Sequence, residues 1–450
     1  MPDYDVLVIG AGAAGMAAAH ALSARGYSLA ILEARDRIGG RMFTIRPSGS
    51  PLPVELGAEF VHGRAPETFQ LAKDAGLTLC ELDGSGWYSA NGRLSEIDEE
   101  GGEDDEATIL QAVKDWQGED QTLQAFIDAR FADDRWAAAR RAATGSVEGF
   151  DAADPEQVSI RWLARSRSAV DLIQVERYFR FIDGYDRPLQ WLRAGLHPEH
   201  TRLLLNTVVQ SIHWQRGHVE VHARSALGTT LEAFTARAAV ITLPLGVLAA
   251  PPDAPGAVRF SPDLPGKRAA VAQLAMGHAA KVVLRFREAF WEHDTPDLPR
   301  LERMFFLFSE DDVMPTWWTS YPLIAPILTG WAGGPRAAKL GQQSDEAVAG
   351  QALDALARAL HVRRGALEAQ LDAWHFHNWS TDPYAYGAYS YARAGGADAL
   401  GALAAPIEDT LFFAGEATNS DGYNALVHGA LVTGTRAARE IIAVGSAAGR

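Results

Sequence analysis

The chain has 450 residues, of which 47% are hydrophobic and 22% are charged, and its formal net charge at pH 7 is −16. This length predicts two or three domains, and the composition is that of a globular protein with a large core. Nucleic acids and anionic membranes are themselves negative, so the acidic balance argues against both as partners. The one cysteine, Cys80, excludes an intramolecular disulfide and lies in a hydrophobic segment that is typical of a core.

The N-terminus predicts no targeting segment. MPDYDVLVIGAG has no basic region and no cleavage site before its glycines, which argues against a signal peptide. No run of about 18 uncharged apolar residues is present, so we expect no membrane span. Because nothing indicates an oxidising compartment, we expect a cytoplasmic protein. The oligomeric state cannot be read from the sequence.

The first 33 residues predict a βαβ unit. DVLVI (residues 5–9) is typical of a buried parallel strand, and MAAAHALSARG (16–26) of a helix that Gly26 ends. A second strand, SLAILEA, carries Glu33 at its end. Strand and helix are joined by the GxGxxG turn of Gly10, Gly12 and Gly15.

The later segments predict a loop first, and then helical and β-rich stretches in turn. Residues 93–106 are acidic and predict an exposed loop, and residues 107–200 have mainly helical spacing. Short β-rich runs follow over 201–250, with KVVLRF from Lys281 as a further strand. A helix is predicted over 345–360, and LFFAGEA near 411 predicts a buried strand before a final helix.

These segments predict an α/β fold with two domains. A Rossmann-like dinucleotide-binding domain is expected from three discontinuous pieces, residues 1–83, 201–280 and 385–450. Residues 84–200 and 281–384 are expected to form an α+β substrate-binding domain, whose cavity the segments 84–200 and 300–340 line. No His, Cys and Asp cluster has metal-ligand spacing, so we predict no metal.

Each glycine of the turn has a physical task. Gly10 allows the tight turn, Gly12 lets a pyrophosphate approach the backbone, and Gly15 lets helix and strand pack closely. The helix N-terminus offers free N–H groups to the phosphates. Glu33, 18 residues after Gly15, is placed to accept hydrogen bonds from a ribose diol. A dinucleotide site is therefore predicted.

Three motifs carry a resemblance to the flavin amine oxidase family: EARDRIGGRMFT (33–44), LGAEFVHG (56–63) and LFFAGEATNSDGYNALVHGALVTG (411–434). They occur in the family's order and span nearly the whole chain. The spacing from Trp379 to Tyr389 is similar to that of the polyamine oxidase and lysine-specific histone demethylase branch.

The resemblance implies FAD as the cofactor. Glu33 would bind the adenosine ribose, Val209 the adenine, and the helix from Val427 the flavin pyrimidine edge. Ala388 stands where mitochondrial monoamine oxidases carry a flavin-linking cysteine, so FAD is expected to be non-covalent. The cofactor-binding residues that the resemblance implies are Gly10, Gly12, Ala14, Gly15, Glu33, Ala34, Arg35, Gly40, Arg41, Gly57, Ala58, Glu59, Phe60, Val209, Trp379, Gly415, Glu416, Leu426 and Val427.

The resemblance also implies four catalytic residues. Lys281 matches the lysine that holds a water near flavin N5, and Trp379 lies near the ring. Tyr389 matches one wall of an aromatic cage, whereas Leu426 replaces the second aromatic wall. His62 matches a substrate-side histidine; with a pKa near neutrality, it would tune the protonation of a bound amine.

The expected reaction is oxidation of a primary or secondary amine, with a polyamine among the candidates. Hydride passes to flavin N5, the imine is hydrolysed, and dioxygen is reduced to hydrogen peroxide. Two alternatives stay open: an L-amino acid oxidase or FAD-dependent desaturase of the same fold, and a flavin-binding protein without turnover. An amino acid oxidase needs a cation for the substrate carboxylate, and Arg180 and Arg303 are candidates for it. Glu59 is a candidate partner for a distal ammonium. Trp317, Trp318 and Tyr321 are interpreted as core packing.

Overall fold

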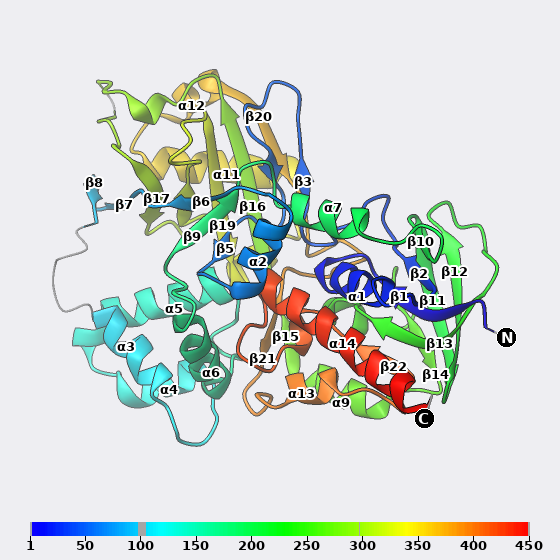
Figure 1. Ribbon diagram of the computed structural model, residues 1–450. Coiled ribbons are helices and arrows are strands. Elements are labelled where there is room, and N and C mark those ends of the chain that lie inside the picture. Colours follow the sequence, from blue (N-terminus) through cyan, green and yellow to red (C-terminus); the bar gives the residue numbers. More distant parts are fainter. Residues whose placement is uncertain (1, 98–104, 297, 449–450) are drawn as a thin grey trace.

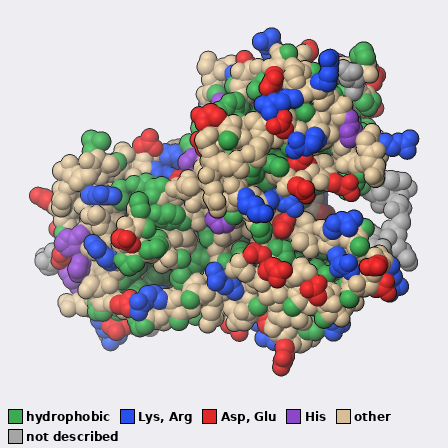
Figure 2. Space-filling model, turned by 180° about the vertical axis from the view of Figure 1, so that it is seen from behind, with side chains coloured by type: hydrophobic (Ala, Val, Ile, Leu, Met, Phe, Trp, Pro, Cys, Tyr) green, Lys and Arg blue, Asp and Glu red, His purple; other side chains and the backbone are tan. Residues whose placement is uncertain are grey.

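The computed structural model describes residues 2–97, 105–296 and 298–448. Two large sheets form the framework, and a helical group lies beside them (Figure 1). Acidic and basic side chains are interspersed over the face of the molecule seen from behind (Figure 2). Among the described residues, no helix is both long enough and apolar enough to cross a bilayer.

The first sheet binds the chain's three distant pieces together. Five strands run parallel, in the order β10 (Thr201–Leu204), β2 (Leu29–Leu32), β1 (Tyr4–Ile9), β13 (Phe234–Ile241) and β22 (Leu411–Phe413). The remaining strands are β12 (His218–Ser225), antiparallel to β13, then β11 (Thr207–Gln215) and β14 (Arg259–Ser261). The parallel half is the Rossmann-like part, and the βαβ prediction is confirmed there.

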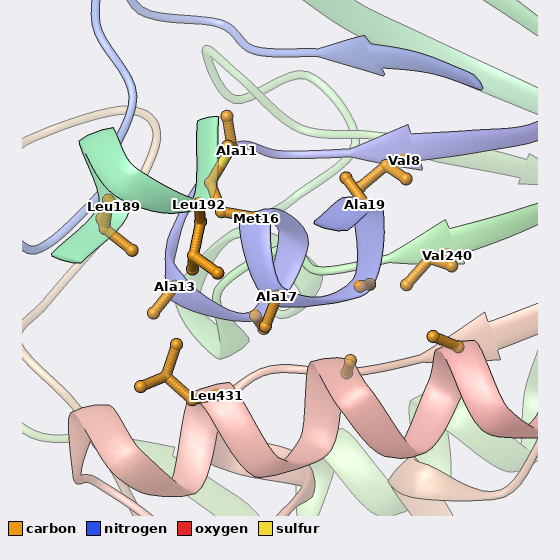
Figure 3. Packing of buried hydrophobic residues seen from close by; sticks show 14 of the residues in the cluster. Val8, Ala11, Ala13, Met16, Ala17, Ala19, Leu189, Leu192, Val240 and Leu431 are labelled. Carbon is orange, nitrogen blue, oxygen red and sulfur yellow. The ribbon is translucent and has the colours of Figure 1, made fainter. Parts of the chain in front are cut away.

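The side chains of β1 point alternately to the two faces of the sheet, and burial on both faces explains why this strand is central. Val6 and Val8 belong to the cluster under α1 (Ala13–Ser23) and α14 (Val427–Ala448), whereas Leu7 and Ile9 face the opposite cluster. A strand buried on both faces needs this continuous apolar run. Figure 3 shows α1 lying along α14, with Ala13 and Ala17 directed toward Leu431. Small side chains let the two helices approach closely.

The second sheet has seven strands, which come from residues 85–96 and 279–376. Its order is β20 (Leu371–Phe376), β16 (Ala279–Phe286), β19 (Ile327–Gly333), β18 (Thr316–Trp318), β17 (Met304–Ser309), β7 (Ser85–Ala90) and β8 (Arg93–Glu96). A smaller sheet has three strands in the order β5 (Val61–His62), β9 (Tyr178–Phe181) and β6 (Leu79–Leu82). Two further sheets have two strands each: β15 (Leu274–Met276) pairs with β21 (Ser390–Ala392), and β3 (Thr44–Ile45) pairs with β4 (Val54–Glu55).

The remaining helices pack on the outside of the two large sheets or form the helical group beside them. They are α2 (Pro66–Asp74), α3 (Asp105–Lys114), α4 (Leu123–Arg130), α5 (Ala137–Asp151), α6 (Ile160–Asp171), α7 (Arg187–Ala194), α8 (Leu245–Leu248), α9 (Pro265–Ala272), α10 (Gly334–Leu340), α11 (Asp345–Ala359), α12 (Arg364–Gln370) and α13 (Ala399–Ala404). Helices α3 to α6 share a cluster with β15 and β21, and α10 and α11 cover the seven-stranded sheet.

Three sequence predictions need correction. Residues 107–200 are mainly helical, but β9 interrupts them because its residues pair with β5 and β6, which a local spacing does not reveal. The loop expected over 93–106 begins with β8 and ends with the start of α3, and residues 98–104 lie outside the described residues. Cys80, expected in the core, is only half-buried on β6. The division into two domains stays a prediction.

Candidate active site

One cavity of about 1460 Å³ connects the two large sheets. It begins at the turn between β1 and α1, passes the end of β2, and continues to β17, β18 and α5. All of the predicted site residues except Gly15 line it. Residues from the start, middle and end of the chain therefore surround one continuous space.

The glycine turn has the geometry that a dinucleotide requires. Gly10 has a φ of +101°, and a Cβ there would lie 2.7 Å from Thr242 Oγ1. A Cβ on Gly15 would lie 1.9 Å from the Gly10 carbonyl oxygen, so Gly15 serves the packing of α1 and does not line the cavity. A Cβ on Gly12 would meet nothing closer than 4.0 Å, which leaves its backbone open to a ligand.

Glu33 stands at the end of β2 with its carboxylate fixed from two sides. The backbone N–H of Ala11 donates to Oε2 at 2.7 Å, and that of Arg35 donates to Oε1 at 2.9 Å. Burial raises the pKa of Glu33, while these two hydrogen bonds oppose the rise. Each carboxylate oxygen keeps a lone pair for a further donor, such as a ribose hydroxyl.

Both predicted arginines are ion-paired at the cavity wall. Arg35 contacts Asp382 through two hydrogen bonds of 2.7 and 2.8 Å, and its guanidinium lies over the Trp379 ring. Arg41 donates to Glu416 Oε1 at 2.8 Å and to the Ala388 carbonyl at 2.7 Å. These ion pairs connect the motif of residues 33–44 to the segment that carries Asp382 and to the motif of residues 411–434, which carries Glu416.

The loop from Leu56 to Phe60 forms the opposite wall. Trp379 Nε1 donates to the Leu56 carbonyl at 2.8 Å, and Lys281 Nζ donates to the Gly57 carbonyl at 3.0 Å. Lys281, the third residue of β16, also forms an ion pair of 2.6 Å with Glu59 Oε2. Glu59 Oε1 accepts from Arg180 and from Trp318 Nε1, so this carboxylate is enclosed by donors.

Aromatic side chains surround the part of the cavity that contains Tyr389 and His62. The Tyr389 hydroxyl donates to the Phe150 carbonyl at 2.8 Å, and burial raises the pKa of this phenol. His62 lies edge-to-face with Phe60, Phe150 and Tyr178, with ring centroids 5.3 to 6.0 Å apart. These contacts give the cavity a largely apolar surface beside Lys281.

His62 differs from its sequence expectation in its ionisation. Burial lowers its pKa to about 4, so the imidazole is neutral at pH 7, and its Nδ1 has no hydrogen-bond partner among the described residues. The expected pKa near neutrality is wrong because the apolar rings disfavour the charged form. His428, interpreted from the sequence as structural, is buried on α14, and burial lowers its pKa to about 4 as well.

Several cavity residues escaped the sequence analysis. Thr242 Oγ1 donates to the Ile9 carbonyl at 2.7 Å; its signal is a polar residue that closes the apolar run of β13. Asp151 and Arg167 form a 2.8 Å ion pair at the end of α5, for which the sequence holds no local signal. Asn424 accepts from Trp162 Nε1 at 2.9 Å, and it lies inside the third motif.

The three aromatics interpreted as core packing fit that description to different degrees, and Tyr321 is half-buried against the cluster of Leu82, Phe305 and Trp318. Trp317 is fully buried in the seven-stranded sheet, whereas Trp318 is buried but also lines the cavity. Arg303 donates to the Tyr321 hydroxyl at 3.1 Å, outside the cavity lining. Neither Arg180, held by Glu59, nor Arg303 is placed as a carboxylate ligand for an amino acid.

A dinucleotide cradle that opens directly into an aromatic, lysine-bearing cavity indicates a dinucleotide-dependent oxidoreductase. The family model of flavin containing amine oxidoreductases matches residues 13–93 and 91–442. The chain therefore belongs to the flavin-containing amine oxidoreductase family and is an FAD-dependent amine oxidoreductase.

Curated relatives lie on the expected branch. The chain is 30% identical to polyamine oxidase 3 of Oryza sativa subsp. japonica, over 97% of this chain and 88% of that protein. It is 28% identical to the lysine-specific histone demethylase 1 homolog 3 of Arabidopsis thaliana, over 98% of this chain and 30% of that protein.

Solved structures confirm the fold. Wild-type putrescine oxidase bound to putrescine superposes with a TM-score of 0.80 at 21% identity, covering 98% of this chain and 99% of that one. Cyclohexylamine oxidase from Brevibacterium oxydans IH-35A gives a TM-score of 0.77 at 22% identity, covering 98% and 100%.

The residues present fit FAD. The open backbone at Gly12 and the N-terminus of α1 suit a pyrophosphate, and Glu33 suits a ribose. Val427 begins α14 at the cavity wall, so the positive end of the helix dipole faces the space beside Leu426. Ala388 lines the cavity without a nucleophile, in agreement with non-covalent binding.

Proposed function

We propose that the chain oxidises a polyamine or a linear diamine and that dioxygen accepts the electrons. The observation that carries this is the shape of the cavity beyond Tyr389. It continues between α5 and the segment 309–316, and its lining there includes the exposed carboxylates of Glu176, Glu310 and Asp312 and the exposed guanidinium of Arg141. These three carboxylates form no salt bridge with a described residue. A cavity with an apolar interior and an excess of carboxylates among its exposed lining residues suits an alkyl chain with several cationic nitrogens.

The wall of α5 supports an extended substrate. Ala138, Ala142, Gly145 and Gly149 recur at helical spacing on the face that lines the cavity. Small side chains leave room for a chain to lie along the helix. The names of two relatives, a polyamine oxidase and a putrescine oxidase, point to the same substrate class.

The aromatic wall acts on the amine's proton. An alkylammonium ion must lose a proton before its nitrogen lone pair can assist the loss of hydride from the adjacent carbon. Phe60, Phe150 and Tyr389 desolvate that nitrogen, which favours its neutral form. Neutral His62 adds no positive charge, and its free Nδ1 is a candidate acceptor for an amine N–H. FAD, when bound, takes up the hydride equivalent and passes the electrons on.

The cofactor roles of individual residues follow from their positions. We assign Glu33 to the adenosine ribose, Arg41 and Glu416 to the pyrophosphate and ribityl region, and Trp379 to the flavin face. Lys281, with one ammonium hydrogen toward the cavity, is assigned to hold a water. We also propose a cytoplasmic location, in accordance with the single cysteine.

A peroxide-coupled screen of the purified flavoprotein tests the proposal. Spermine, spermidine, N-acetylpolyamines and putrescine are compared with benzylamine, tyramine and L-amino acids, while the flavin absorbance is followed without oxygen. We expect rapid bleaching and peroxide with polyamines or diamines. Turnover restricted to monoamines or amino acids contradicts the substrate class, and bleaching without peroxide contradicts dioxygen as acceptor.

A further inference from the structure

Glu59 is a buried carboxylate held between two cations. Its Oε2 lies 2.6 Å from Lys281 Nζ, and its Oε1 pairs with the guanidinium of Arg180. Trp318 Nε1 also donates to Oε1, at 3.1 Å. The side chains of Lys281, Glu59 and Arg180 are 4%, 10% and 12% exposed, so water screens these charges little.

Among the described residues, Lys281 has hydrogen-bond acceptors for two of its three donors, and the Trp318 ring centroid lies 5.7 Å from its Nζ. An ammonium group has three hydrogens. Glu59 takes one and the Gly57 carbonyl, at 3.0 Å, takes another. Since Lys281 lines the cavity, the third hydrogen is available to what the cavity contains. The two fixed hydrogen bonds determine the direction of the third.

The charged groups around Lys281 come from two parts of the chain. Glu59 and Glu55 belong to the segment at and after β4, and Arg180 belongs to β9. Burial raises the pKa of Glu55 to about 7, so this carboxyl supplies only part of a negative charge at neutral pH. Without Glu59, the ammonium and the guanidinium would share a buried site as like charges, which is costly.

We propose that Glu59 is a positioning residue: it orients the Lys281 ammonium for the amine oxidation and balances its charge against Arg180. The proposal differs from the hypothesis that Glu59 binds a distal substrate ammonium. Lys281, Arg180 and Glu59 together carry one net positive charge, which the partly ionised Glu55 offsets only in part, so this wall repels a second cation. Glu59 therefore acts through Lys281 on every amine substrate, whether or not it carries a second nitrogen.

Substitutions at both positions test the proposal. Glu59→Gln keeps the size of the side chain and removes its charge, and Lys281→Met removes the ammonium. Displacement of a catalytic group by about 1 Å costs about a hundredfold in rate, so we expect Glu59→Gln to lower kcat by roughly ten- to a hundredfold for a diamine and a monoamine alike, with little change in KM. In the Lys281→Met background, Glu59→Gln should cause no further loss.

Controls keep the outcome interpretable. Glu199→Gln removes an exposed carboxylate outside the cavity lining and should leave kcat and KM unchanged. Glu59→Asp keeps the charge and should restore part of kcat. If Glu59→Gln does not fold, Glu59→Asp tests the geometry instead: its shorter side chain withdraws the carboxylate from Lys281, and kcat should fall to the same extent for the diamine and the monoamine. FAD content and the absorbance spectrum of bound FAD are recorded for each protein, and the spectrum should change in Glu59→Gln and Lys281→Met but not in Glu199→Gln.

Two results overturn the proposal. One is a rise in KM that occurs with the diamine and not with the monoamine, which assigns Glu59 to the substrate. The other is an additive loss in the double variant, which separates Glu59 from Lys281. Failure of the amine oxidation itself is distinguishable, because the unsubstituted protein would then be inactive with every amine.

Discussion

Arg35 and Asp382 are 347 residues apart in sequence and face each other in a bidentate ion pair at the edge of the cofactor cavity. Asp382 Oδ2 also accepts from His377 Nε2 at 2.7 Å, and Oδ1 accepts from the backbone N–H of Tyr384 at 2.9 Å. These donors hold the pKa of the Asp382 carboxyl well below its usual range, against the effect of burial. The pair ties the segment that carries Trp379 to the segment that carries Glu33.

Asp382→Asn is expected to weaken both folding and FAD binding. Removing one partner of a buried ion pair costs about 3 kcal/mol, because the other charge stays buried. The melting temperature and the FAD dissociation constant, measured by fluorescence quenching, check this. Asp186→Asn breaks the more exposed pair with Arg46 and should cost less than about 1 kcal/mol. Equal effects of the two substitutions would contradict a special role of Asp382.

Gly15→Ala is expected to prevent FAD binding. The new Cβ would lie 1.9 Å from the Gly10 carbonyl oxygen, so α1 must move away from the turn. Gly401 in α13 is exposed and its Cβ would meet nothing within 4 Å, so Gly401→Ala should stabilise the helix by about 0.5–1 kcal/mol. Flavin content after purification and thermal unfolding distinguish the two. Full flavin loading of Gly15→Ala would show that the turn is more adaptable than its geometry indicates.

The cofactor end of the cavity was predictable because its residues follow local rules. A glycine turn between a buried strand and a helix fixes where Gly10 and Gly12 stand, and the next strand fixes Glu33. The family resemblance of two further segments added Lys281, Tyr389 and Trp379, which all line the cavity. Each of these residues belongs to a short segment with a recognisable order of residues.

The substrate end was less predictable because long-range pairing decides it. Only through its pairing with β5 and β6 does the strand β9 bring Tyr178 to the cavity wall and Arg180 to Glu59. The Asp151–Arg167 pair depends on how α5 packs against α6. The ionisation of His62 depends on three rings from different segments, so its residue type alone indicated the wrong pKa.

Tyr389 is expected to act through its ring more than through its hydroxyl. Tyr389→Phe loses the hydrogen bond to the Phe150 carbonyl, a net effect of about 1 kcal/mol, and should change kcat/KM by less than about tenfold. Tyr389→Ala removes the wall itself and should lower kcat/KM far more. Steady-state kinetics with one good amine substrate compares them. A phenylalanine variant as impaired as the alanine variant would assign the function to the hydroxyl.

The exposed carboxylates of the cavity lining are expected to attract polyamines. The double substitution Glu310→Gln and Asp312→Asn should raise KM for spermine severalfold at low salt and leave KM for benzylamine nearly unchanged, because exposed charges act on the more highly charged substrate. The difference should shrink at high salt, since mobile ions screen exposed charges. Glu199→Gln serves as the matched control. An effect of equal size on benzylamine would contradict electrostatic attraction.

His62 is expected to make the folded protein sensitive to acid. Burial lowers its pKa to about 4, whereas an unfolded histidine titrates near pH 6.5. Between these values the unfolded chain binds the proton and the folded chain does not, so stability is complete above pH 6.5 and falls as the pH drops toward 4. The shift corresponds to a loss on the order of 3 kcal/mol in the free energy of unfolding.

Thermal unfolding of His62→Gln tests this. The stability of the variant should fall less steeply with falling pH, although buried His428 still contributes to that fall. His200→Gln, an exposed control, should keep the original slope, and an unchanged slope in His62→Gln would show that the imidazole is not buried in its neutral form.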